Sequence, residues 1–344
     1  MPKYRIIFAL AVLSGLSSLC FAKDGAGRVK KIVERSTLNQ PGTKPFHLTA
    51  VIAPSRESDR GSNRTGEVEI WWASPTRWRR EVRSPEFHQL VVVNGAQEWQ
   101  KNEGDYFPEW LRETAVALVE PVPYLDQALK MVNLADVKTI FGNTYYAWMS
   151  MSTDGNVEKG MGATIAVTDK TGLLFYGGDL GWGALFKDYK NFHGRIVAMT
   201  VTHGTPEVTA RVTTLEELGD APAGLFDAAA SGGDLPLLQT VIVEEKVLRK
   251  SLLPMDPFVW PPLKDGPQEG VMTTDIAVDR AGRVREIGTI VTDNNAMSEA
   301  ARKIISKMEF TPYSLKGVPV QVVSRITVPF KATRPQGDAP RSIP

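Results

Sequence analysis

The chain has 344 residues, 42% of them hydrophobic and 23% charged, a globular composition that excludes wholesale disorder and collagen-like repeats. Its 40 Lys and Arg nearly balance 39 Asp and Glu, and the net charge of +1 argues against a dedicated nucleic-acid binder, which needs a basic excess or patch. One cysteine excludes a disulfide framework and cysteine-based zinc or iron–sulfur sites. At roughly 100–200 residues per domain, the length predicts two domains.

The first 22 residues have the layout of a secretory signal peptide. Lys3 and Arg5 are positively charged, residues 6–19 are mainly apolar, and Cys20-Phe-Ala22 ends on a small residue that suits a cleavage site. We predict cleavage after Ala22 and a periplasmic protein, because a mature chain without cysteine suits an oxidising compartment. The alternative is an uncleaved N-terminus that anchors the protein in the inner membrane, although the apolar run is short for a span of about 20 residues.

A polar segment, residues 23–45, precedes a run of predicted strands. From Phe46 hydrophobic residues recur with a period of two, which predicts strands over residues 46–52, 66–72 and 77–82. Asn94-Gly95 predicts a hairpin over residues 90–100, since this dipeptide tolerates the positive φ angles of a two-residue turn. Residues 46–100 are therefore expected to form an antiparallel meander.

Two helices and further strands are predicted next. Apolar residues at helical spacing indicate helices over residues 108–119 and 124–137. Strands resume at residues 145–151, 163–168, 173–177, 186–189, 196–203 and 208–215. The first domain is expected to span residues 46–236, ending in an Ala-, Gly- and Pro-rich stretch.

The remaining chain predicts a linker and a small second domain. Residues 237–265 are expected to be a short strand followed by a Pro-rich linker. Residues 266–331 follow the order strand, strand, helix, strand, with Asn294 or Asn295 as N-cap. The apolar face of that helix consists of Met297, Ala301, Ile304, Ile305 and Met308. The Pro-rich tail, residues 332–344, is expected to be disordered.

The sequence contains no recognisable catalytic constellation. The Gly-x-Ser-x-Gly, His-Glu-x-x-His and phosphate-loop patterns are absent, and the four histidines, at positions 47, 88, 193 and 203, are scattered. We therefore predict that the protein is not an enzyme and holds neither a metal nor a cofactor. The less favoured alternative is a hydrolase whose site the sequence does not reveal.

The distribution of tryptophans leaves two interpretations open. All eight precede the last predicted domain, and six lie between residues 71 and 148. They either fill a large β core or line an apolar cavity for an acyl chain. Trp71 and Trp72 are neighbours on one predicted strand and therefore face opposite sides of it. For the cavity interpretation, the candidate lining residues are Trp71, Trp72, Trp78 and Trp99.

Residues 46–228 resemble the bacterial lipoprotein-sorting proteins of the LolA/LolB type. The similarity lies in Gly66-Glu-Val-Glu-Ile-Trp, Pro75-Thr-Arg-Trp-Arg-Arg, Val92-Val-Asn-Gly-Ala-Gln-Glu-Trp, Lys187-Asp-Tyr-Lys-Asn-Phe-His-Gly and Leu225-Phe. It implies an open, curved antiparallel sheet, capped by helices, that encloses an apolar cavity for lipid acyl chains. The family's functional residues are not assigned to positions of this chain.

Residues 266–331 resemble the C-terminal domain of TonB-type proteins. The similarity lies in Gly270-Val, Val278-x-x-x-Gly-Arg-Val, Ala300-Ala, Met308-Glu-Phe-Thr-Pro and Gly317-Val-Pro-Val. It implies a small sheet with one helix that binds an extended segment of a partner by strand addition at a free edge.

The last strand, residues 318–330, is the expected docking edge of that domain. Gln321, Val323 and Arg325 are its expected pairing positions. The chain departs from TonB energy transducers because residues 1–22 contain no histidine and a folded domain replaces their long Pro-rich spacer.

These patterns predict a mainly β fold with an α+β tail. A curved antiparallel half-barrel sheet capped by helices is followed by a small β-β-α-β domain similar to that of TonB. We expect a periplasmic protein of cell-envelope transport that binds an apolar or lipid ligand and docks a protein partner, such as an outer-membrane receptor or another envelope protein. The alternative is a TonB-like energy transducer anchored by an uncleaved N-terminus.

Overall fold

The structure is a computed structural model, and it forms two compact units. It describes residues 27–56, 63–126, 135–140, 142–148, 150–151, 157–158, 164–179, 182–204, 207–234, 237–255 and 257–334. The first unit comprises the chain up to Pro85, Leu90–Glu98 and Trp110–Gly233. The second unit comprises Glu86–Gln89, Trp99–Glu109 and the chain from Asp234 onward. The predicted signal peptide and most of the predicted tail lie outside the described residues.

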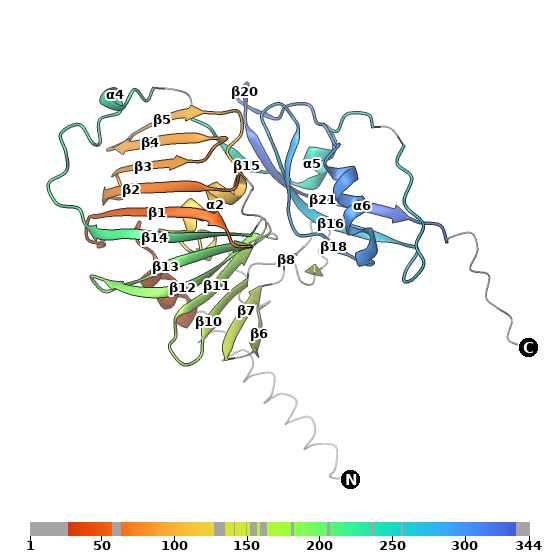
Figure 1. The fold of residues 1–344 in the computed structure, drawn as a ribbon, viewed down its shortest axis with the longest axis horizontal. Coiled ribbons are helices and arrows are strands. Elements are labelled where there is room, and N and C mark those ends of the chain that lie inside the picture. Colours follow the sequence, from red (N-terminus) through yellow and green to blue (C-terminus); the bar gives the residue numbers. More distant parts are fainter. Residues whose placement is uncertain are drawn as a thin grey trace, which may run out of the picture. The chain divides into compact units, whose positions relative to one another are not determined.

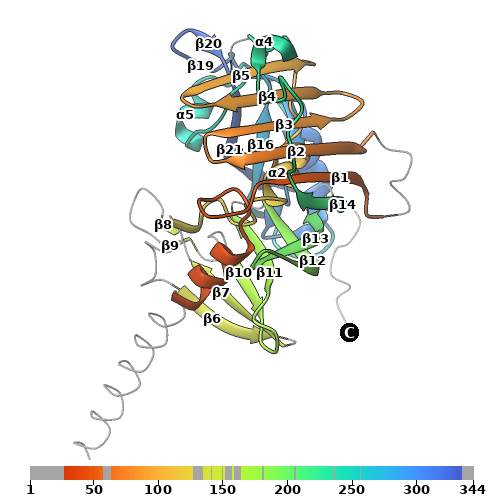
Figure 2. The same ribbon diagram turned by 90° about the vertical axis from the view of Figure 1, so that its left-hand side faces the viewer.

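An open twelve-stranded sheet dominates the first unit (Figures 1 and 2). Its order is β5-β4-β3-β2-β1-β14-β13-β12-β11-β10-β7-β6, so that β5 and β6 are its two ends. The strands are β1 (Phe46–Pro54), β2 (Gly66–Ser74), β3 (Arg77–Arg83), β4 (His88–Asn94), β5 (Gln97–Glu103), β6 (Ala135–Ile140), β7 (Asn143–Trp148), β10 (Thr164–Thr168), β11 (Leu174–Asp179), β12 (Trp182–Phe192), β13 (Arg195–Gly204) and β14 (Glu207–Glu217). A further pair, β8 (Ser150–Met151) and β9 (Val157–Glu158), is separate from it.

The predicted meander is confirmed, and its period of two sets the buried face. Phe46, Leu48, Ala50 and Ile52 of β1 are buried, and the residues between them are more exposed. The predicted hairpin turn places Gly95 at φ +68°, a conformation that glycine adopts without strain. Irregular register in β1, β2 and β10 marks bulges, which bend a sheet and so favour its curvature.

Helix α2 (Glu109–Ala117) and the residues after it lie on this buried face. A Cβ atom added to Gly66 of β2 would stand 3.0 Å from a methyl carbon of Leu111, and one added to Gly177 of β11 would stand 3.1 Å from a methyl carbon of Val122. The helix predicted over residues 108–119 is thus confirmed. The helix predicted over residues 124–137 is wrong at its C-terminal end, where Ala135–Ile140 forms β6, because pairing with β7 outweighs local helical spacing.

The predicted polar segment contains a helix that belongs to the first unit. This N-terminal helix, residues 27–36, buries Val29 and Val33. The chain after it is tied to the end of the α2 segment, where Leu38 N donates to Val119 O over 2.7 Å. Among the described residues, no helix is long and apolar enough to cross a membrane.

A second sheet, of order β15-β21-β16-β17 with β18 also paired to β16, organises the second unit. Its strands are β15 (Thr240–Ile242), β16 (Glu269–Val278), β17 (Val284–Ile287), β18 (Val291–Thr292) and β21 (Gln321–Lys331), and a separate small pair is formed by β19 (Ser314–Leu315) and β20 (Val318–Pro319). The second strand of the predicted order is two short strands, β17 and β18. Helix α6 (Ser298–Ile305) follows a 3-10 turn, η3 (Asn295–Met297), whose cap is Asn294, and the predicted apolar face is buried.

The predicted linker packs on the second unit. Of residues 237–248, only Thr240–Ile242 forms a strand, and Glu245–Arg249 forms helix α5. Leu248 and Leu263 are buried in the same core as α6, and the ring of Trp260 lies 6.0 Å from that of Phe330. These residues do not form a solvated linker, because burial of their apolar side chains in the core of the second unit is favourable.

Candidate functional site

An apolar cavity of about 180 Å³ lies at the buried face of β1, β2 and β3. Its floor is the face that alternation predicts, with Ile70 and Trp72 on β2. Phe46 stacks on Trp72 with ring centroids 5.4 Å apart. The lining residues are Asn39, Phe46, Ile70, Trp72, Pro75, Trp78, Arg80 and Val119.

The four candidate tryptophans divide into two groups. Trp72 and Trp78 face each other across β2 and β3, and both line the cavity. Trp71 points to the opposite face of the sheet, where it stacks on His47 at 5.3 Å and carries the guanidinium of Arg79 at 5.3 Å. Trp99 belongs to the second unit and does not line the cavity.

Arg80 places a positive charge in the wall of this apolar cavity. It follows Trp78 by two residues on β3, so both side chains point to the same face, and its guanidinium carbon lies 6.0 Å from the Trp78 ring centroid. Burial, aided by the charge of Arg112, lowers the pKa of Arg80 to about 10, against the opposing effect of Glu98. Arg80 therefore stays cationic at neutral pH. Alternation along β3 is the sequence signal for Arg80, because it places residues 78 and 80 on the same face of the strand.

A buried histidine, His203 on β13, is a second unusual group of the first unit. It is 2% exposed, and burial together with the charge of Arg112 lowers its pKa to about 4. It is therefore neutral in the folded protein near pH 7.

We expect His203 to make the first unit acid-sensitive. Its pKa is lower in the folded protein than the ordinary value of about 6.5, so between these pH values the unfolded chain binds more protons and stability rises with pH. The free energy of unfolding should fall by up to about 3 kcal/mol as pH drops from about 6.5 to about 4. Denaturant titrations across this range should show a shallower pH slope for His203→Gln. His193→Asn, at an exposed turn with φ +48°, is the control and should keep the slope; an unchanged slope in His203→Gln would exclude this histidine as the cause.

The predicted docking strand, β21, is not a free edge over its first three residues. β15 pairs with it in parallel, matching Thr240 with Gln321 and Ile242 with Val323. Gln321 N donates to Gln239 O over 3.0 Å, and Val243 N donates to Val323 O over 3.0 Å. Farther along β21, the Glu245 carboxylate accepts from Thr327 N at 2.8 Å.

The three expected docking side chains are also engaged within the second unit. The amide of Gln321 accepts from Phe107 N at 2.7 Å and donates to Phe107 O at 3.1 Å. Val323 is buried against Tyr106 and Ala277. Arg325 pairs with buried Asp275, with Nε and Oδ1 3.4 Å apart. The sequence showed no signal for these contacts, because they join segments more than 80 residues apart or residues in different strands.

No family model matches the chain, and no curated protein matches it. Similar solved structures include a LolA superfamily protein of Nitrosomonas europaea, with 11% identity and a TM-score of 0.36 over 59% of this chain and 98% of that one. A DUF1329 family protein of Desulfovibrio piger has 12% identity and a TM-score of 0.35 over 61% of this chain and 98% of that one. The MucA/MucB complex of Pseudomonas aeruginosa has 12% identity and a TM-score of 0.27 over 84% of this chain and 100% of that one. Such low values do not assign the chain to a family, and the resemblance of residues 266–331 to TonB gains no support from them.

Proposed function

We propose that the first unit binds an apolar ligand, such as the acyl chain of a lipid, in the cavity beneath Trp72 and Trp78. The observation that carries this proposal is the cavity itself, about 180 Å³ in volume and walled mainly by apolar side chains. A dry apolar cavity of roughly 150 Å³ is large enough to bind benzene, so this one suits the end of an acyl chain. It is smaller than the roughly 300–1,000 Å³ of pockets that enclose a whole drug-sized ligand.

The charge of Arg80 gives the ligand a second requirement. A guanidinium in a low-dielectric wall interacts more strongly with an anion than one in water does. We therefore expect the ligand to carry a carboxylate or another anionic group near its apolar end, with Arg80 as its partner. The protein would bind and carry this ligand without catalysing a reaction, in the periplasm to which the predicted signal peptide directs it.

A titration of the delipidated protein with a fluorescent fatty acid tests the cavity. Val119 lines the cavity, so the larger side chain in Val119→Phe should fill part of it. We expect the affinity for the fatty acid to fall at least about tenfold, which corresponds to a loss of about 1.4 kcal/mol in binding free energy. The matched control is Val51→Phe, on the exposed side of β1, which should bind like the wild type. Equal affinities for both variants and the wild type would place the ligand elsewhere.

Arg80 is tested by comparing a fatty acid with its methyl ester. The wild type should prefer the acid, and Arg80→Met should lose that preference while keeping a similar apolar volume. If Arg80→Met still distinguishes acid from ester, the anionic group lies away from Arg80.

Docking of a protein partner by the second unit stays a prediction from sequence. The positions expected to pair, Gln321 and Val323, already face β15, so an incoming strand would first have to displace it. The proposal for the first unit does not depend on such a partner.

A further inference from the structure

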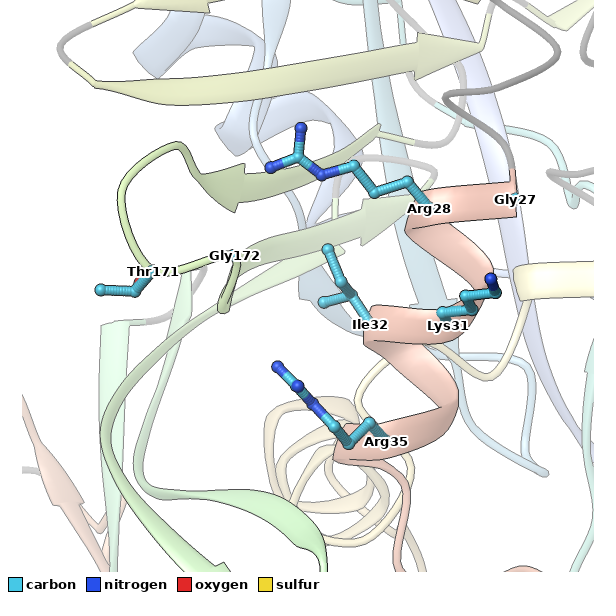
Figure 3. Close-up of a pocket in the computed structure, with 7 residues that line it drawn as sticks. All are labelled: Gly27, Arg28, Lys31, Ile32, Arg35, Thr171 and Gly172. Atoms are coloured by element: carbon cyan, nitrogen blue, oxygen red, sulfur yellow. The ribbon is translucent and has the colours of Figure 1, made fainter.

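A cationic groove lies between the N-terminal helix and the turn that joins β10 to β11. Figure 3 shows Arg28, Ile32 and Arg35 extending from the helix toward this turn, while Lys31 lies on the other side of the helix backbone. The groove is open and has a volume of about 540 Å³. Thr171 and Gly172 of the turn form its other wall.

Two cations of the helix, Arg28 and Arg35, share the face that lines the groove. They are seven residues apart, which brings them to the same side of an α-helix, and Lys31 lies between them in sequence with its side chain on the other side of the helix backbone. All three are exposed, and no carboxylate of the described residues forms an ion pair with any of them. The fourth cation of the helix, Lys30, differs because it pairs with Glu34 at 3.7 Å. Like charges three or four residues apart destabilise a helix, so Arg28, Lys31 and Arg35 do not stabilise the N-terminal helix through their charges.

Packing and a hydrogen bond fix the position of the N-terminal helix and of its charged side chains. Val29 and Val33 are buried beneath it. At its C-terminal end, the guanidinium of Arg195 on β13 donates to Glu34 O at 3.0 Å. This contact ties the last turn to the sheet and offsets the partial negative charge of a helix C-terminus. The groove therefore exists before any ligand arrives.

We propose that this groove binds the phosphate headgroups of anionic membrane lipids and so docks the first unit on a membrane surface. Guanidinium groups recognise phosphate oxygens through paired hydrogen bonds, and Arg28 and Arg35 stand on either side of Ile32. An open groove fits a surface better than it fits a small molecule that must be enclosed. This docking is independent of the cavity beneath Trp72.

Vesicle flotation with the protein as purified from its own cell envelope tests the proposal. Vesicles of phosphatidylcholine are compared with vesicles that also contain phosphatidylglycerol, at low salt and at roughly 1 M salt, where the Debye length falls from about 10 to about 3 Å. We expect binding that requires phosphatidylglycerol and is lost at high salt. A cation near an anionic surface contributes about fivefold in affinity, so the triple variant Arg28→Gln, Lys31→Gln, Arg35→Gln should bind roughly 100-fold more weakly.

The control removes the same charge from other exposed positions of the first unit. The triple variant Lys30→Gln, Lys44→Gln, Arg211→Gln should bind nearly like the wild type, and circular dichroism shows that both triple variants are folded. Equal losses in the two variants would mean that net charge, not the groove, drives binding, and would overturn the proposal. Binding that is indifferent to phosphatidylglycerol would overturn it as well.

A soluble phosphate monoester distinguishes a membrane surface from a free ligand. Glycerol phosphate, added to the wild type without vesicles, should bind far more weakly than vesicles do, because a surface presents many headgroups at once. If it binds as tightly as the vesicles and the groove variant abolishes this binding, the groove is a site for a soluble phosphate and the membrane proposal is wrong.

Discussion

Replacing Gly282 by alanine is expected to prevent the second unit from folding. Gly282 lies in the turn between β16 and β17 at φ +85°, and a Cβ atom there would stand 1.8 Å from the carbonyl oxygen of Phe310. That contact involves backbone, which no side-chain rotation can relieve, and Phe310 N also donates to Gly282 O at 2.8 Å. We expect a loss of more than about 4 kcal/mol in the free energy of unfolding, a size that marks a broken core contact.

Gly317→Ala is the matched control for this prediction. Gly317 has nearly the same backbone angle, φ +82°, but nothing lies within 4 Å of the added Cβ. Gly317→Ala should therefore lower the free energy of unfolding only by the strain of the left-handed conformation, about 1–2 kcal/mol. Hydrogen exchange of the amides of β16 and β21 measures the stability of the second unit in both variants. Similar protection of these amides in the two variants would show that the close approach of residue 282 to Phe310 is absent.

The second large effect is expected at Trp72. This side chain is 3% exposed and stacks on Phe46 with an angle of 15° between the rings. Trp72→Ala should cost about 3–5 kcal/mol, because truncating a buried tryptophan removes its transfer free energy and enlarges the cavity beside it.

Its neighbour Trp71 provides the comparison within the same strand. Trp71 lies on the other face, where its contacts are His47 and Arg79 at the partly exposed surface. Trp71→Ala should cost about 1 kcal/mol, in the range of aromatic and cation–π contacts at such sites. Denaturant unfolding of both variants measures the difference, and equal costs would contradict the assignment of the two faces.

The contrast between these tryptophans shows what a local pattern can predict. Alternation along β2 assigns opposite faces to Trp71 and Trp72, because successive side chains of a strand point in opposite directions. The same rule places Arg80 beside Trp78. It cannot show that Val119, from a different part of the chain, completes the cavity wall.

The resemblance of residues 266–331 to TonB implies a small sheet with one helix and a free edge for strand addition. A small sheet and helix α6 are present in this region, and Gly282 of the quoted motif has a clear steric role. The edge is not free at Gln321, Val322 and Val323, because three residues of the short predicted strand before the linker pair with β21 there. A short apolar stretch carries no information about which strand it will join.

Local patterns predicted the meander of β1 to β5, helix α2 and the apolar face of α6, since each depends on the spacing of residues within one segment. Local patterns did not predict the pairing of β15 with β21, the hydrogen bonds of Gln321 with Phe107, the wall of the cavity or the cationic groove. These features join segments that are distant in the chain. The free energy that brings these segments together comes from the burial and pairing of two surfaces. Local periodicity identifies the apolar face of one segment but does not identify the segment that packs against it.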